Sequence, residues 1–232
     1  MIQTVKNHWQ MILISGIVFA LWGSPVVTPL RILIVFFHEI SHALAAIFTG
    51  GSVERIALYS NEGGLTITRG GSRFIISSAG YLGSLLIGVA LFLIAVNSAR
   101  DRIAMAVLGA LLIGITALYT RDRFGIVFGL AMGGLMLVMA RKVSIVVNDL
   151  MLRVIGLSSM IYVPYDIVSD TLLRPEGAMG QYSDAYALAS ITFGSGKMWG
   201  LIWLGISLFV IALCLRFGLG ERSNIVFGDK EA

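Results

Sequence analysis

"FFHEISHALAAIFTGG", residues 36–51, places two histidines and a glutamate inside a run of aliphatic and aromatic residues. Ionisable side chains are costly in the hydrocarbon core of a bilayer, and those found there usually serve a function. On a helix, His38 and His42 lie four positions apart on one face, with side chains roughly 5–6 Å apart. Two imidazoles so placed can ligate one zinc ion, while Glu39 can take a proton from metal-bound water. The pattern therefore predicts two metal ligands, His38 and His42, and one catalytic base, Glu39.

The His-Glu-x-x-His pattern also arises by chance in helices, where its histidines only hydrogen-bond to neighbouring helices. The chain contains three histidines, however, and two of them fall in this motif. Small residues follow the motif at Ala43, Ala45 and Ala46, which suits close packing around a site. The remaining histidine, His8, is most simply an interfacial residue near the N-terminus. These observations favour a functional site in this segment.

The whole chain is too apolar for an ordinary soluble domain. Hydrophobic residues make up 57% of it, charged residues make up 13%, and the mean hydropathy is +0.88, whereas soluble domains carry about 25% charged residues. The net charge of +4 does not indicate nucleic-acid binding, because the basic residues stand singly or in pairs at segment ends, as at Arg121 and Arg123. The single cysteine, Cys214, excludes an internal disulfide framework. The composition predicts an integral, multi-pass protein of the cell membrane that contacts lipid and no nucleic acid.

About seven apolar segments are long enough to be considered as membrane spans, judged with a window of about 19 residues. Short loops join the third to the sixth, so we expect one membrane-embedded domain over residues 1–232. The predicted fold is all-α, a compact bundle of about six to seven transmembrane helices. The first run ends without a small-x-small cleavage site, so we interpret it as an uncleaved span rather than a signal peptide. The segments are 9–27, 29–49, 74–96, 103–119, 124–140, 149–168 and 198–217.

Two of these segments carry small residues at every fourth position. Rows of this kind let helix backbones approach closely in lipid, so we interpret both as packing seams. The rows are Gly80, Ser84 and Gly88 in one segment, and Gly125, Gly129 and Gly133 in the other.

A β-hairpin is predicted at the membrane surface over residues 52–70, SVERIALYSNEGGLTITRG. The four residues NEGG make a plausible turn between two strands. An open strand edge beside the polar span could accept an extended peptide, although a hairpin that only caps the bundle fits the pattern equally well. The apolar positions are Val53, Ile56 and Leu58 before the turn, and Leu65 and Ile67 after it.

Three stretches together resemble the site-2 protease family of intramembrane zinc metalloproteases. They are HEISHALAAIFTGG at 38–51, NEGGLT at 61–66 and SSAGYLGSLLIG at 77–88. In that family a span with His-Glu-x-x-His is followed by a Gly-rich β region at the membrane surface and by a span that opens with an Ala-Gly-Pro-like motif. The likeness covers residues of about 30 to 90, with Tyr81 standing where many members have proline. SDAYALA, at 183–189, looks like the shorter branch of the family, which lacks an inserted PDZ domain.

The resemblance implies a third metal ligand, an aspartate in a later span that commonly lies within a Leu-Asp-Gly motif. This chain has no such motif, so four aspartates are candidates. Asp149 begins a segment and can pair with Arg153 four residues later, which explains it without a metal. Asp184 follows a serine ahead of AYALA and indicates a helix start.

Asp166 is the preferred third ligand. It lies deepest in apolar sequence and follows Pro164, which can break a helix and let a carboxylate turn inward. Asp170 shares its helix face and could be a ligand or a partner of one. Asp170 and Asp184 are held in reserve, and an aspartate that is only hydrogen-bonded at the interface remains the alternative for Asp166.

The predicted function is that of a zinc-dependent intramembrane endopeptidase acting on membrane-spanning or membrane-associated proteins or peptides, with Glu39 activating a zinc-bound water. The alternative is a non-catalytic metal carrier or scaffold that retains the site. A transporter would show polar residues in several spans and an internal repeat, and an iron-dependent oxidase would need many more histidines. Glu39 separates the two main hypotheses, because a carrier has little use for a base beside its metal.

Overall fold

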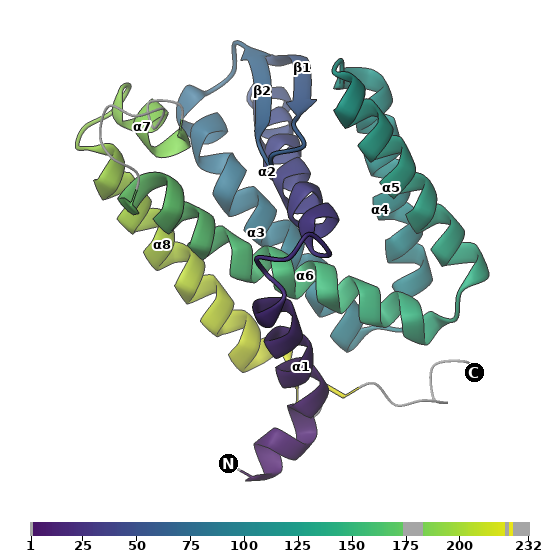
Figure 1. The fold of residues 1–232 in the computed structure, drawn as a ribbon. Coiled ribbons are helices and arrows are strands. Elements are labelled where there is room, and N and C mark those ends of the chain that lie inside the picture. Colours follow the sequence, from purple (N-terminus) through teal and green to yellow (C-terminus); the bar gives the residue numbers. More distant parts are fainter. Residues whose placement is uncertain (1, 174–182, 221–222, 225–232) are drawn as a thin grey trace.

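A computed structural model describes residues 2–173, 183–220 and 223–224 of the chain (Figure 1). In chain order, the elements are α1 (Ile2–Ala20), α2 (Thr28–Phe48), β1 (Ser52–Leu58), β2 (Gly64–Arg69), α3 (Arg73–Asn97), α4 (Asp101–Tyr119), α5 (Arg123–Lys142), α6 (Ile145–Ile167), the π-helical turn η1 (Val168–Leu173), α7 (Asp184–Ala189), α8 (Gly196–Leu213) and the π-helical turn η3 (Cys214–Gly218). The hairpin of β1 and β2 lies alongside α2, and α3 and α6 pack against α2 (Figure 1).

Six of the described helices are long and apolar enough to cross a membrane. They are α2, α3, α4, α5, α6 together with η1, and α8 together with η3. Helix α1 is not among them, because polar residues such as Lys6, Asn7 and Gln10 occupy its first half and because it ends at Ala20. The structure thus confirms the predicted all-α polytopic bundle.

Helix α2 is the most enclosed of the six spans. Its first turn contains Pro29, whose missing N–H would have had no helical partner. The chain leaves the helix at Gly50, whose φ of +82° is one that L side chains rarely adopt. In its most apolar window, 72% of α2 is buried inside the protein, the largest share of any of these spans. Protein rather than lipid therefore surrounds the polar side chains that α2 carries.

The predicted rows of small residues do form packing seams. At Gly88, a Cβ atom would meet Ser159 and the carbonyl oxygen of Gly156, so α3 and α6 are in backbone contact there. At Gly133, a Cβ atom would meet the carbonyl oxygen of Gly109, which brings α5 against α4. Close approach at a missing side chain is the usual way in which helices associate in lipid.

The predicted hairpin is present, with β1 antiparallel to β2. A bulge between Val53 and Arg55 explains why the apolar residues of β1 do not alternate strictly. The outer edge of β1 is covered, because Ile56 forms a bridge with Thr120 and the main-chain N–H of Leu58 donates to Asp122. Figure 1 shows this edge facing α4 and α5. The other edge of the sheet belongs to β2, which pairs with no further strand in the described part of the chain.

A buried ion pair joins segments of the chain near the N-terminal end of α6. The Nε of Arg153 lies 2.5 Å from Oδ1 of Asp149, and its Nη2 lies 3.1 Å from Oδ2. Arg153 also donates to the carbonyl oxygens of Ala95, at the end of α3, and of Ser223. Both charged side chains are almost fully buried, at 0% exposure for Asp149 and 2% for Arg153. The predicted pairing of Asp149 with Arg153 is confirmed, and it ties three parts of the chain together.

Replacing Arg153 by methionine should lower the free energy of unfolding by about 3–5 kcal/mol, because it removes the positive charge that is paired with the buried carboxylate of Asp149. Chemical unfolding in detergent micelles measures this. The double change Asp149→Leu with Arg153→Met should recover most of the loss, since no buried charge then remains. As a control, Arg69→Met removes the exposed ion pair with Glu54 and should change stability by about 1 kcal/mol or less. Equal losses in the single and double variants would contradict the explanation.

Candidate metal centre

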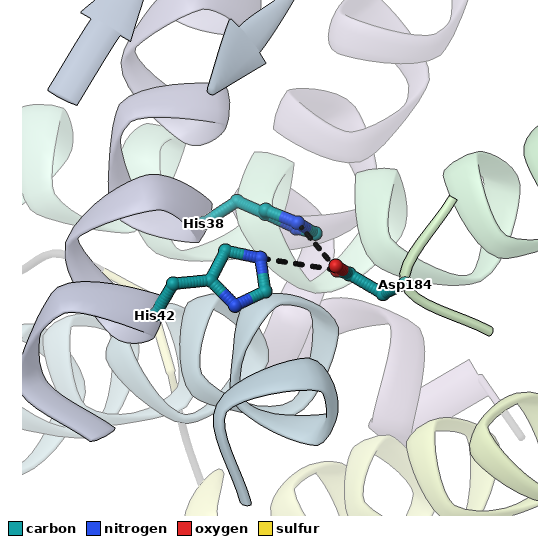
Figure 2. A group of neighbouring side chains, drawn as sticks. All are labelled: His38, His42 and Asp184. Atoms are coloured by element: carbon teal, nitrogen blue, oxygen red, sulfur yellow. Dashed lines mark ion pairs between the residues drawn. The ribbon is translucent and has the colours of Figure 1, made fainter. Parts of the chain in front are cut away.

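Two imidazoles and one carboxylate converge between α2 and α7. Figure 2 shows His38 and His42 on one face of α2, directed at Asp184, the first residue of α7. The Nε2 atom of His38 lies 2.9 Å from Oδ2 of Asp184, and Nε2 of His42 lies 3.1 Å from the same oxygen. The two rings stand edge to face with centroids 4.7 Å apart, as residues four apart on a helix allow. These three side chains form a group that could hold a metal ion.

Both histidines are oriented by α3. Nδ1 of His42 lies 2.7 Å from the carbonyl oxygen of Ile76. A carbonyl oxygen can only accept, so Nδ1 of His42 carries a proton, and Nε2 is the nitrogen that faces Asp184 and can take a proton or a metal ion there. His38 is held differently, by the ring of Tyr81, whose centroid lies 4.8 Å away at an interplanar angle of 82°. The ring nitrogens that face Asp184 are therefore set by partners outside α2.

Gly80 leaves the space in which the two histidines meet. A Cβ atom at this position would overlap the Nε2 atoms of both His38 and His42. The sequence pattern predicts only a packing role for this glycine. In the structure it has a second role. A larger residue at this position would overlap the two Nε2 atoms and occupy the space that a metal ion bound by them needs.

The charges of the group favour a cation. Burial alone would raise the pKa of Asp184, but the positive charge that His42 and His38 can carry outweighs burial and holds the pKa of this carboxyl below its ordinary range. Protons or a metal ion can supply that positive charge. Two imidazole nitrogens and one carboxylate oxygen are a donor set of catalytic zinc sites, where ligands lie about 3.4 Å apart around a tetrahedral ion. The residues present fit a zinc ion.

The structure does not place Asp166, the preferred third ligand, in this group. Asp166 lines the same cavity as the histidines, and its hydrogen-bonding neighbour is Tyr162, one turn earlier on α6. The expectation rests on a helix break at Pro164, but α6 continues through this proline, so Asp166 stays on the wall formed by α6. Asp170 follows in η1 and lines the cavity as well. The reserve candidate, Asp184, is the carboxylate that the fold brings to both histidines.

Glu39 is buried next to His38 and faces the hairpin. It is 5% exposed, and the hydroxyl of Thr66, in β2, donates a 2.6 Å hydrogen bond to its Oε2 atom. At Gly64, also in β2, a Cβ atom would overlap the carboxylate of Glu39. The first two residues of the predicted motif, His38 and Glu39, thus have different surroundings. The imidazole meets Asp184, and the carboxylate meets β2.

A polar cavity of about 840 Å³ lies beside the three candidate ligands. Its wall is formed by α2, β2, α3, α6 and the start of α7, and it includes Glu39 and most of β2. This volume falls within the range of about 300–1,000 Å³ found for ligand pockets. The cavity gives water and a polar backbone a place to reach the group from within the bundle.

A family model described as Peptidase M50B-like matches residues 11–214, which is most of the chain. The chain belongs to this peptidase family. This agrees with the resemblance to site-2 proteases, and with the six apolar helices it identifies an integral, multi-pass membrane protein. No curated protein and no solved structure matches the chain. Family membership supports a peptidase, and the group of His38, His42 and Asp184 is one that could hold a metal ion.

Three supporting groups of the site have a weak signal in the sequence or none. The carbonyl oxygen of Ile76 has none, because every residue has one. Gly64 and Thr66 stand two apart in a predicted strand and therefore on one face, which is a local signal that their side chains meet the same neighbour. That this neighbour is Glu39 follows only from the way the hairpin folds back over α2.

Proposed function

We propose that this M50B-like protein is a zinc-dependent intramembrane endopeptidase. The observation that carries the proposal is the convergence of His38, His42 and Asp184 on one point beside Glu39, inside a polar cavity of a chain from a peptidase family. His38, His42 and Asp184 would hold the metal ion. Such an ion lowers the pKa of a coordinated water to about 7 and polarises a carbonyl group.

Glu39 would move the proton during hydrolysis. Its carboxylate lines the cavity next to His38, where it can accept a proton from the attacking water and then donate it to the leaving amine. The peptide C–N bond breaks, the water oxygen is added to the carbonyl carbon, and the amine leaves with the proton. Because this carboxylate is buried among protein groups, little bulk water is present to accept the proton in its place.

The substrate would be a membrane-spanning or membrane-associated segment that loses its helix in the cavity. A helix hides its peptide bonds in its own hydrogen bonds, so the scissile region must become extended. The free edge of β2 lines the cavity and could pair with this extended segment by strand addition. The covered edge of β1 makes β2 the docking strand.

Removal and return of the metal tests the proposed function. The purified protein is placed in lipid vesicles with a panel of single-span peptides and an unfolded soluble protein. Cleavage should cease after treatment with a zinc chelator and return when zinc is added at one equivalent. Cleavage that survives complete metal removal would contradict the metallopeptidase. A protein that binds one zinc and cleaves none of the panel would support the carrier or scaffold.

A further inference from the structure

We propose that Thr66 is the positioning residue of Glu39, so that a side chain of β2, outside the helix that bears the motif, orients the proposed catalytic base. The inference deepens the proposed function and rests on it, since it presumes that Glu39 acts as the base. It assigns a role in the reaction to a strand residue outside the metal-binding motif.

The contact between Thr66 and Glu39 is direct and short. The hydroxyl of Thr66 lies 2.6 Å from Oε2 of Glu39 and 3.1 Å from the main-chain oxygen of the same residue. Hydrogen bonds to an ionised carboxylate are the short and strong ones. The hydroxyl thus holds the side chain of Glu39 against its own backbone, which removes rotational freedom from a group that must meet one water molecule.

The strand is shaped to receive this carboxylate. Gly64 and Thr66 are two residues apart on β2, so their positions face the same side of the sheet. At Gly64, a Cβ atom would overlap Oε1 of Glu39, the oxygen that Thr66 does not bind. One position of the strand therefore provides the donor, and the neighbouring position provides the space.

The hairpin is also fixed to α2 at a second point. Arg31, two turns before Glu39 on α2, forms a 2.8 Å ion pair with Glu62 in the hairpin turn. Glu62 has a φ of +66°, which a residue with a side chain seldom adopts. The contacts of Glu62 and Thr66 with α2 lie on either side of Gly64 and fix the position of β2 along α2. The hydroxyl of Thr66 is therefore held in place relative to Glu39. Because β2 also offers the free edge, the same strand would dock substrate and orient the base.

The test compares Thr66→Val, which keeps the shape and removes the hydroxyl, with Thr66→Ser, which keeps the hydroxyl. Thr66→Val should lower kcat by about 10- to 100-fold, which corresponds to the loss of one hydrogen bond to a charged group. KM, zinc content and the thermal unfolding midpoint should stay close to those of the wild type. Thr66→Ser should restore kcat to within a few-fold of the wild-type value.

Thr116→Val is the matched control. It removes a buried threonine hydroxyl with an equally short bond, 2.6 Å to the carbonyl oxygen of Leu112, in α4 and outside the cavity. If Thr116→Val and Thr66→Val lower kcat equally, the role of Thr66 is structural and the inference is wrong. It is also wrong if Thr66→Val keeps wild-type kcat, or if Thr66→Val loses zinc.

Glu39→Gln, measured beside these variants, separates the two claims. An inactive Glu39→Gln together with a fully active Thr66→Val overturns the positioning role and leaves the peptidase intact. A fully active Glu39→Gln overturns Glu39 as the base, and with it the proposed function that assigns the proton transfer to this residue.

Discussion

Glutamine in place of Glu39 should lower kcat by about 10²- to 10⁴-fold, the contribution of a positioned general base. The amide has the shape of the carboxylate but cannot accept the proton of the attacking water. Zinc content should equal that of the wild type, because the carboxylate of Glu39 faces Thr66 and Gly64 rather than Asp184. Peptide cleavage in lipid vesicles and metal analysis of the same preparation measure both quantities.

Glu54→Gln is the control for this substitution. Glu54 is an exposed carboxylate on β1 whose partner is Arg69, so its loss should leave kcat unchanged. Loss of zinc from Glu39→Gln would show that Glu39 is a ligand and would require another base. Cleavage at the wild-type rate would favour the carrier or scaffold, which has no need of this residue.

The second large effect is expected at Asp184, the proposed third ligand. Asparagine in place of Asp184 should weaken zinc binding by more than about 100-fold, since even partners outside the ligand shell contribute 10- to 100-fold. The change keeps the volume of the side chain and removes the charge that faces both Nε2 atoms. His38→Ala and His42→Ala should have the same consequence. Competition with a chromogenic zinc chelator measures the affinity.

Asp166→Asn provides the decisive comparison, because it makes the same chemical change in the same cavity. It should retain zinc, since Asp166 has Tyr162 as a hydrogen-bonding neighbour and is outside the group formed by the histidines and Asp184. If Asp166→Asn loses the metal and Asp184→Asn keeps it, the ligand set drawn from the structure is wrong. If both lose it, the carboxylates act together and the site must rearrange when the metal enters.

The parts of the site that could be predicted are those set by local geometry. His38 and His42 share a face because any helix places residues four apart together, and apolar sequence around them is enough to predict the helix. The hairpin follows from turn residues and from apolar positions within a few residues of one another. Even the irregular spacing of Val53 and Ile56 has a local cause, the bulge beside Arg55.

Which aspartate meets the two histidines could not be predicted, because this depends on the packing of distant helices. Asp166 is the deepest aspartate in the sequence, but depth in an apolar run does not say which way a side chain points. Asp184 has the sequence pattern of a helix start, and it is one. What brings it to the histidines is the packing of α7 against α3, a contact with no signal in the residues around Asp184. The sequence likewise predicts Gly80 only as a packing residue, since a glycine beside a helix and a glycine beside a ligand look alike in sequence.

The enclosure of α2 has a consequence for the making of the protein. The ribosome makes this polar span early, and it makes α3, α6 and Asp184, which surround or face the span in the folded protein, later. Until then the histidines and the glutamate lack the helices that bury them and the carboxylate that faces both Nε2 atoms. We therefore expect the group of His38, His42 and Asp184 to form only after the later helices have packed, and any activity that depends on this group to begin only then.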